Sequence, residues 1–316
     1  MLKFIMLKFI VIRVLWLIPI IIGVSIFVFT IMYFAPGDPA MIILGPLATD
    51  EMLELKRIEL GIDQSYFVQL GVFLRDVFLR GDLGNSFRTN QSVFGQVMMR
   101  LPNTLYLALG STFLAVLLGI PLGVVAATNQ HTWKDNASVF SSLFFDSMPS
   151  FWFALLLVMI FSLRLGWLPS TGADTLRHYI LPCVAVALGS AGGIARQTRS
   201  SMLEVVRQDF ISTARSKGQS ERVVKYRHAL KNALIPIITV VGLQIAGMFG
   251  SAIIAEAIFT IPGVGSYMLL SINSRDYPAV RGGVLIIAIC FSLIMLIVDI
   301  IYALVDPRIR EQYDEA

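Results

Sequence analysis

Glu204–Pro236 reads EVVRQDFISTARSKGQSERVVKYRHALKNALIP, a basic island between two long apolar segments. From Arg196 to Lys231 the chain carries nine lysines and arginines but only three acidic residues. A short loop of this charge is typical of the cytoplasmic side of a membrane. Gly218 interrupts a helical apolar pattern, so the stretch predicts a helix, a break and a second helix. Three roles fit this loop: a connector, a lipid-surface helix, or a docking surface for a cytoplasmic protein.

The composition of the chain places it among membrane proteins. Of its 316 residues, 56% are hydrophobic and 15% are charged, whereas a soluble domain carries about 25% charged residues. The basic residues cluster beside apolar segments without interleaved aromatic residues, which argues against nucleic-acid binding. Cys183 and Cys290 both lie in apolar segments, so we expect small buried side chains there and neither a disulfide nor a metal pair.

Six apolar segments are long enough to cross a bilayer, which takes about 20 residues per helix. They are residues 14–34, 101–128, 138–163, 179–195, 233–258 and 282–305. The fourth is short and rich in glycine, which suits close contact between helices. The sequence therefore predicts an all-α polytopic membrane protein with six transmembrane helices. The first segment has a longer apolar run than a cleaved signal peptide, so we expect it to be retained. The repeated MLKFI at the start is assigned no function.

The positions of lysine and arginine predict the orientation. Basic residues mark the N-terminus (1–13), the central loop (197–232) and the C-terminal tail (306–316), and Lys134 lies in a short loop on the same side. With six spans, all of these segments are cytoplasmic. Residues 35–100 then lie outside the cell, and residues 101–305 form a five-helix core. The outer loop carries eight acidic and six basic residues, so it has no cytoplasmic charge signature.

The outer loop predicts a small helical subdomain at the outer membrane face. A helix is expected over residues 52–60, capped by Thr49 or Asp50 and ended by Gly61. A second, amphipathic helix is expected over residues 66–80. Residues 81–86 then form a turn, because glycine and aspartate dominate them.

The chain has no motif for chemistry of its own. It has no phosphate-binding loop, no zinc-protease motif and no Cys-x-x-Cys pair, so we expect no ATP, cofactor or metal site. Asp146 lies inside the third apolar segment, where an acid is costly and often functional. It either pairs with Arg196 or Arg199 or lines a pathway; we favour the pair. Gln244 is a second candidate of this kind, and Glu256 and Asp299 are expected near the membrane interfaces.

Motifs of a known family run through almost the whole chain. They are Phe34-Ala-Pro-Gly-Asp-Pro39, Leu60-Gly-Ile-Asp63, Gly81-Asp-Leu-Gly84 with Ser86, Arg100-Leu-Pro-Asn-Thr104, Ser147-Met-Pro-Ser-Phe151, Leu165-Gly-Trp-Leu-Pro169, Ala195-Arg-Gln-Thr-Arg199, residues 209–218, residues 228–236, residues 259–265 and Arg275-Asp-Tyr-Pro278. Each is weak alone. In this order and spacing they resemble the permease subunit of the dipeptide/oligopeptide/nickel family of bacterial ABC importers.

The central loop also resembles the EAA coupling loop of such importers. Thr213-Ala-Arg-Ser-Lys-Gly218 fits the T-A-R-A-K-G of the peptide branch at all but one position. The generic pattern fits less well, since His228 and Lys231 stand where it has isoleucine and proline. The resemblance implies that residues 204–232 dock on a separate ATPase. The candidate coupling residues are Asp209, Thr213, Ala214, Arg215, Lys217, Gly218, Ser220 and Glu221. The small Ala214 and Gly218 would allow close approach, and Arg215 and Lys217 would pair with acids of the ATPase.

The resemblance implies a type I ABC importer permease in the bacterial cytoplasmic (inner) membrane, forming half of a peptide pathway. Its implied partners are a homologous second permease (as a heterodimer), two subunits that bind ATP and Mg, an extracytoplasmic substrate-binding protein and membrane lipid. Glutathione and nickel chelates remain alternative substrates. An ion-coupled secondary transporter acting alone is a second hypothesis, but it expects internal repeats and ionisable groups at mid-membrane, and only Asp146 comes near that depth. An intramembrane enzyme would need a paired nucleophile and base. Co-purification of ATPases would separate these hypotheses.

Overall fold

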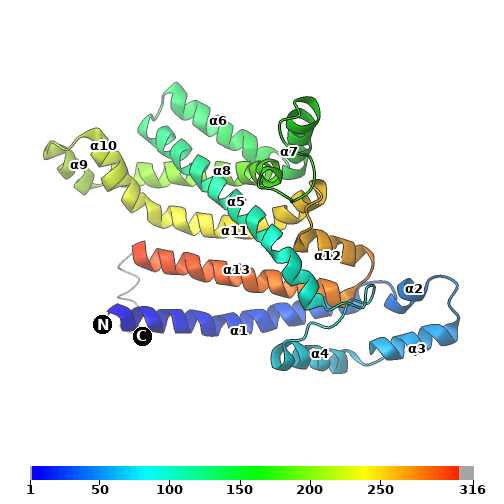
Figure 1. Ribbon diagram of the computed structural model, residues 1–316. Helices are drawn as coiled ribbons and strands as arrows, with labels where there is room; N and C mark the ends of the chain where they lie inside the picture. Colours follow the sequence, from blue (N-terminus) through cyan, green and yellow to red (C-terminus); the bar gives the residue numbers. More distant parts are fainter. Residues whose placement is uncertain (1, 306–316) are drawn as a thin grey trace. The chain divides into compact units, whose positions relative to one another are not determined.

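The computed structural model describes the backbone of residues 2–305 and the side chains of residues 10–302 (Figure 1). Within this part of the chain all regular structure is helical, apart from one isolated β-bridge between Asn85 and Ser92. The predicted cytoplasmic tail, residues 306–316, lies outside the described residues, as do nearly all side chains of the repeated start.

The chain divides into two compact units. The first comprises residues 1–9, 104–261 and 294–316, and the second comprises residues 10–103 and 262–293. Three long helices run through both units: α1 (Leu2–Phe34), α5 (Val93–Thr128) and α13 (Tyr277–Val305).

Five helical segments are long and apolar enough to cross a membrane. Besides α1, α5 and α13, they are α8 (Arg177–Val206) and the segment 221–258 that ends in α11 (Lys231–Ile258). A sixth is obtained only if α6 (Trp133–Ser147) is taken together with α7 (Ser150–Leu157) and its π-helical extension η2 (Val158–Arg164), which bend by 99° at their junction. Five of the six predicted segments thus correspond to long apolar helices, and the third corresponds to the bent pair.

The break follows from Pro149. Proline has no N–H to donate, and it keeps the preceding residue out of the helical region. Met148 accordingly has φ −84° and ψ 128°, an extended conformation. The long apolar run of residues 138–163 satisfied the length criterion for one straight span, so the prediction of a single helix was wrong here.

In the first unit, α8 packs against α6, α7 and α11. Gly192 permits the contact with α6, because a Cβ there would collide with the Ser142 backbone. Gly119 of α5 likewise permits a contact between α5 and α8, because a Cβ there would lie 2.8 Å from the carbonyl oxygen of Ala191. The expected role of small residues is therefore confirmed. Helix α8 is longer than the predicted residues 179–195, because the polar stretch that follows stays helical and buries Thr198 and Met202.

The second unit contains the predicted helical subdomain. Its short helices are α2 (Pro39–Leu44), α3 (Asp50–Leu60), α4 (Tyr66–Arg75) with the π-helical extension η1 (Asp76–Arg80), and α12 (Val264–Asn273). As predicted, Thr49 caps α3 by accepting from the Met52 N–H at 3.4 Å. Gly61 ends that helix with φ +65°, a conformation that favours glycine.

Two of the sequence motifs meet in the second unit. The buried carboxylate of Asp276 accepts hydrogen bonds from the Ser86 hydroxyl and, at 3.0 Å, from the Phe87 N–H. Ser86 also accepts from the Thr89 N–H at 3.0 Å. These bonds hold the turn that follows η1 against the start of α13, and they give Ser86 and Asp276 of the two motifs a structural role.

Candidate functional site

The central loop is a helix, a break and a second helix, as its sequence predicts. Helix α9 (Asp209–Ser216) ends at Gly218, whose φ is +74°. The chain resumes with α10 (Glu221–Val223), which follows the extended Ser220, and with the π-helical segment η3 (Val224–Leu230) that leads into α11. The Gly218 N–H donates to the Arg215 carbonyl at 2.9 Å and closes the end of α9. Glycine is favoured here because a Cβ would be strained at this φ.

The inner face of the loop packs on its own chain. Ile211 and Val224 are buried against Met202 and Val205 of α8 and Val124 of α5. This cluster anchors the loop to the ends of two membrane-spanning helices. A force applied to the loop is therefore transmitted to those helices through close-packed side chains.

The outer face of the loop is exposed and polar. It carries seven of the eight predicted coupling residues: Asp209, Thr213, Arg215, Lys217, Gly218, Ser220 and Glu221. A Cβ on Gly218 would meet nothing within 4 Å, so this position faces open space in the described chain. An exposed, mostly basic surface on a rigidly anchored helix pair is suited to bind an acidic groove.

Two expectations about individual loop residues need correction. Ala214 is buried in the same cluster as Ile211, so its small side chain serves the packing of α9 and does not reach the outer face. Arg215 already has a carboxylate partner in the chain, since its Nε donates to Glu221 Oε1 at 2.8 Å. This bond ties α9 to α10 across the break.

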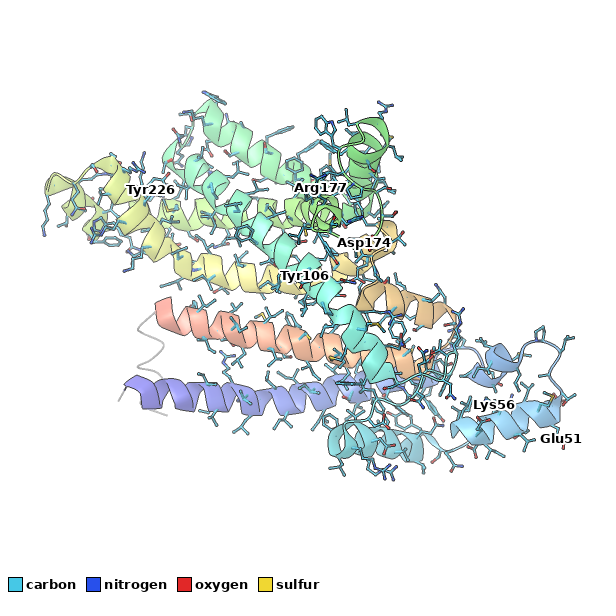
Figure 2. All side chains as sticks on the ribbon, in the orientation of Figure 1. Glu51, Lys56, Tyr106, Asp174, Arg177 and Tyr226 are labelled. Carbon is cyan, nitrogen blue, oxygen red and sulfur yellow. The ribbon has the colours of Figure 1, made fainter. Side chains whose placement is uncertain are left out.

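Two aromatic side chains on the loop escaped the sequence analysis. Phe210 and Tyr226 are both exposed, and Figure 2 shows Tyr226 on the loop. Phe210 directly precedes the buried Ile211, and the helical step of about 100° between neighbours turns it outward. The position of Phe210 next to an inward-facing residue was therefore the sequence signal for its exposure. Exposed aromatic side chains are frequent anchors of protein interfaces.

A polar cavity of about 260 Å³ lies in the first unit at the bend between α6 and α7. Asp146 and Ser150 contribute from the two sides of the bend, Ser190 from α8, and Gln244 and Ser251 from α11. Gln244 lies close to Gly193, where any Cβ would collide with its amide nitrogen. The bend thus brings together Asp146 and Gln244, the two polar residues that the sequence singled out.

Asp146 has an arginine partner. Its Oδ2 accepts from Arg196 Nη2 at 2.7 Å, and its side chain is 45% exposed. Arg196 Nη1 is buried without a hydrogen-bond partner among the described residues. The expected pairing of Asp146 is therefore present, but it lies beside an open cavity and not in a closed core.

Arg199, the other predicted partner, binds a different acid. Its Nε and Nη2 donate to Asp135 at 2.7 and 2.9 Å, in a bidentate pair that joins α8 to α6. The Asp135 side chain is only 4% exposed. Asp135 also accepts from the His131 N–H at 3.1 Å. Asp135 precedes the apolar pattern of the third predicted span, which begins at residue 138, so that pattern did not indicate a buried acid here.

Glu256 lies near the end of α11, and its side chain is enclosed by the protein. It is fully buried in α11 and accepts from the Thr104 hydroxyl of α5 at 2.6 Å. The two residues are 152 positions apart, which is why no local pattern indicated this contact. Within the described residues, no group of three or more histidines, cysteines and acids could hold a metal ion.

Comparisons with known proteins agree with this architecture. Residues 119–311 match the family described as binding-protein-dependent transport system inner membrane component, and residues 6–108 match its N-terminal counterpart. The chain is 41% identical to the dipeptide transport system permease protein DppB of Alkalihalophilus pseudofirmus, over 94% of this chain and 98% of that protein. It is 39% identical to the glutathione transport system permease protein GsiC of Escherichia coli, over 96% and 99%.

A solved structure shares the fold. The chain resembles one from the inward-facing methionine ABC transporter MetNI, with a TM-score of 0.56 and 19% identity, over 67% of this chain and 97% of that one. The family match covers both halves of the sequence, and the relatives match along nearly their full length. This chain therefore belongs to the family of binding-protein-dependent transport inner membrane components: it is a multi-pass permease subunit of an ABC importer in the inner membrane, and ATP is hydrolysed by a partner ATPase.

Proposed function

We propose that this permease imports small peptides, and that its substrates are dipeptides or glutathione. The observation that carries the proposal is the match to permeases named for these substrates along almost the whole chain. Glutathione is itself a tripeptide, so one polar pathway suits both. Nickel chelates, which the sequence left open, have no counterpart among these two relatives.

The proposed pathway wall is the polar cavity at the α6–α7 bend. A peptide carries amide groups and charged ends that need polar partners at mid-membrane. The cavity supplies the Asp146 carboxylate, the Gln244 amide and serine hydroxyls. One permease provides one wall, so a homologous second permease completes the pathway as a heterodimer.

The proposed ATPase contact is the exposed face of residues 204–232. Two ATP-binding subunits, one for each permease, hold ATP and Mg and dock on this face and on its counterpart. Phe210 and Tyr226 supply apolar anchors, while Arg207 and Lys217 supply charge. Ala214 and the Arg215–Glu221 pair hold the loop in shape.

The proposed topology has six spans, with both termini in the cytoplasm and the bent α6–α7 pair counted as one span. Residues 1–13, 197–232 and 306–316 are then cytoplasmic. Residues 35–100 form an outer subdomain that faces an extracytoplasmic substrate-binding protein, and residues 101–305 form the permease core.

Uptake of radiolabelled dialanine tests the substrate. Cells that express the chain with its co-encoded subunits and binding protein should take up dialanine in an ATP-dependent manner, and unlabelled dipeptide or glutathione should compete. Cells without the chain are the control. Uptake that follows an ion gradient, or that is blocked only by a nickel chelate, would contradict the proposal.

A further inference from the structure

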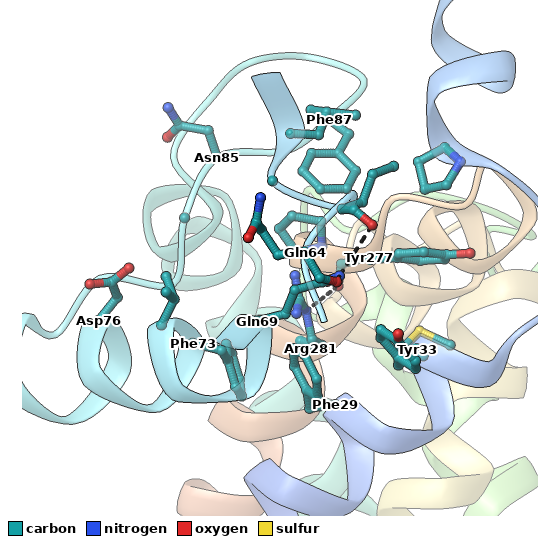
Figure 3. Close-up of a pocket in the computed structure, with 18 of the residues that line it drawn as sticks. Phe29, Tyr33, Gln64, Gln69, Phe73, Asp76, Asn85, Phe87, Tyr277 and Arg281 are labelled. Atoms are coloured by element: carbon teal, nitrogen blue, oxygen red, sulfur yellow. Dashed lines mark hydrogen bonds between the residues drawn. The ribbon is translucent and has the colours of Figure 1, made fainter. Parts of the chain in front are cut away.

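The second unit contains a cavity of about 670 Å³, larger than the cavity at the α6–α7 bend (Figure 3). Its walls come from the end of α1, from α4, from the turn after η1 and from the start of α13. A volume of this size is typical of sites for small molecules. Neither the proposed pathway nor the docking face uses it.

Arg281 of α13 is the main cation in this cavity. Its guanidinium carbon lies 5.1 Å from the ring centre of Phe29 and 5.0 Å from that of Phe73. Its Nε makes a long contact of 3.3 Å to the Tyr277 carbonyl oxygen. Among the described residues no carboxylate forms an ion pair with it. Figure 3 shows Arg281 among the aromatic rings and Gln69. Ring faces hold a guanidinium by cation–π attraction and leave its donor edge for a ligand.

The acids that line the cavity have other partners. Asp38 binds Arg57 at 2.6 Å. Asp76 binds Arg75 at 3.0 Å, and this hydrogen bond holds the pKa of the Asp76 carboxyl below its usual range. Asp82 accepts from the Gly84 N–H at 2.8 Å. Asp276 attracts Arg281 only at longer range, and its carboxylate is bound by Ser86 and by the Phe87 N–H. Arg281 is therefore the lining cation that no carboxylate of the described chain contacts directly.

An aromatic cluster lies beside the cavity. Tyr33 and Phe34 at the end of α1 contact Tyr66 of α4, with ring centres 5.1 and 6.2 Å away, and Tyr66 contacts Phe67 at 5.2 Å. Phe34 is 73% exposed and Phe67 80% exposed. Tyrosines and exposed aromatic rings at the end of a spanning helix are typical of the headgroup level of a bilayer.

The same cavity has an apolar side. Val68 and Val72 of α4 line it and are also exposed on the outer surface of that helix. A ligand here would contact a cation on one side and apolar side chains on the other. Such a combination matches an amphiphile whose charged end is anionic.

We propose that this cavity binds a phospholipid, with the headgroup phosphate on Arg281 and the start of an acyl chain along Val68 and Val72. A planar guanidinium suits phosphate because two parallel N–H donors can meet two oxygens. The lipid would connect α1, α4 and α13 and so stabilise the second unit in the membrane. This site is separate from the peptide pathway and does not depend on the identity of the transported substrate.

The test measures the thermal unfolding midpoint of the detergent-purified importer after its native lipid has been washed out. Dihexanoyl-phosphatidylglycerol at saturation should raise the midpoint by about 3 °C or more. Arg281→Gln should abolish the rise. Arg88→Gln, which removes the same charge from an exposed position in the turn that follows η1, should keep it. Dihexanoylglycerol, which lacks the phosphate, should have no effect.

A second variant keeps the test decisive if Arg281→Gln fails to assemble. Val68→Trp fills the cavity from an exposed helix face and leaves Arg281 in place, so it should also remove the rise. The proposal is overturned if either variant retains the full rise or if dihexanoylglycerol produces it. It is equally overturned if inorganic phosphate alone gives the full Arg281-dependent rise, because the site would then bind free phosphate. The same holds if dialanine gives the full rise, because the site would then bind substrate.

Discussion

Arg196 and Arg199 lie three positions apart on α8 and hold different acids in different surroundings. The Asp135 side chain paired with Arg199 is 4% exposed, whereas the Asp146 side chain paired with Arg196 is 45% exposed. Breaking a buried pair leaves an uncompensated charge, but an exposed pair contributes little to stability. The two carboxylates therefore have different roles: Asp135 serves the fold, and Asp146 is available to the cavity.

Stability should report this difference. Asp135→Asn should lower the stability of the permease by about 3 kcal/mol, near the lower end for buried pairs because Arg199 stays partly exposed. The matched change Asp146→Asn should cost less than about 1 kcal/mol. Yield of the assembled importer and its thermal unfolding midpoint measure both. Equal losses from the two variants would show that burial does not separate them.

Substrate transport should be more sensitive to Asp146 than its effect on stability suggests. If Asp146 lines the pathway, Asp146→Asn should leave assembly intact but change how strongly positively and negatively charged dipeptides compete with dialanine uptake. The loss of a carboxylate should weaken competition by cationic peptides most. An unchanged competition profile together with normal yield would place Asp146 outside both the fold and the pathway.

Single-residue predictions from the sequence succeeded where the signal was local. An acid inside an apolar segment is conspicuous, so Asp146 was found together with its correct partner Arg196. Asp135 was missed because helix α6 begins at Trp133, earlier than the apolar pattern indicated. Glu256 is buried against Thr104 because two helices far apart in the sequence meet. The periodicity of one helix carries no information about such a contact.

At the scale of elements, the coupling loop combines an anchored inner face with an exposed outer face. Gly218 lies at the only left-handed position between α9 and α10. Its φ of +74° costs an ordinary L-residue roughly 1–2 kcal/mol, although the space around it is open. Asparagine tolerates this conformation better than other residues with a side chain.

Substitution at Gly218 should separate backbone strain from contact with the ATPase. Gly218→Leu should leave the permease in the membrane but weaken ATPase co-purification or uncouple ATP hydrolysis from uptake. Gly218→Asn keeps the left-handed turn and adds a smaller side chain. A defect in both variants would indicate steric contact with the ATPase, and a defect in leucine alone would indicate strain. Normal substrate-stimulated hydrolysis and uptake in the leucine variant would show that the loop is not the coupling site.

Most helices were predictable because periodicity and end signals agree. Thr49 and Gly61 mark the two ends of α3 in the structure, as the sequence predicts. The bend at Pro149 was the exception, since a continuous apolar run concealed it. Pro149 was the local signal of the break. Length alone therefore overestimated the continuity of that span.

At the scale of the whole molecule, composition established the class and lysine and arginine placement predicted the orientation. The division into two units was not predicted, because it depends on contacts between segments far apart in sequence. The long helices α1, α5 and α13 each contribute to both units, so no linker composition marks the boundary.

Cysteine labelling tests the orientation. The native Cys183 and Cys290 are first replaced by alanine. A cysteine at the exposed position 219 should then react with a membrane-impermeant thiol reagent only from the cytoplasmic side, and one at the exposed position 65 only from outside. Labelling from both sides after permeabilisation is the control for reactivity. The reverse pattern would overturn the proposed topology.

The bend at Met148-Pro149 also bears on how the nascent chain enters the bilayer. Helix α6 has 15 residues, and α7 with η2 has 8 and 7. A helix that partitions into lipid by itself needs about 17–25 apolar residues, so neither arm is long enough to leave the translocon alone. Both arms pack on α8, and Gly192 of α8 lies against the backbone of α6. We expect ribosome-bound chains truncated before residue 177 to retain residues 133–164 at the translocon, and chains that include α8 to release them into lipid.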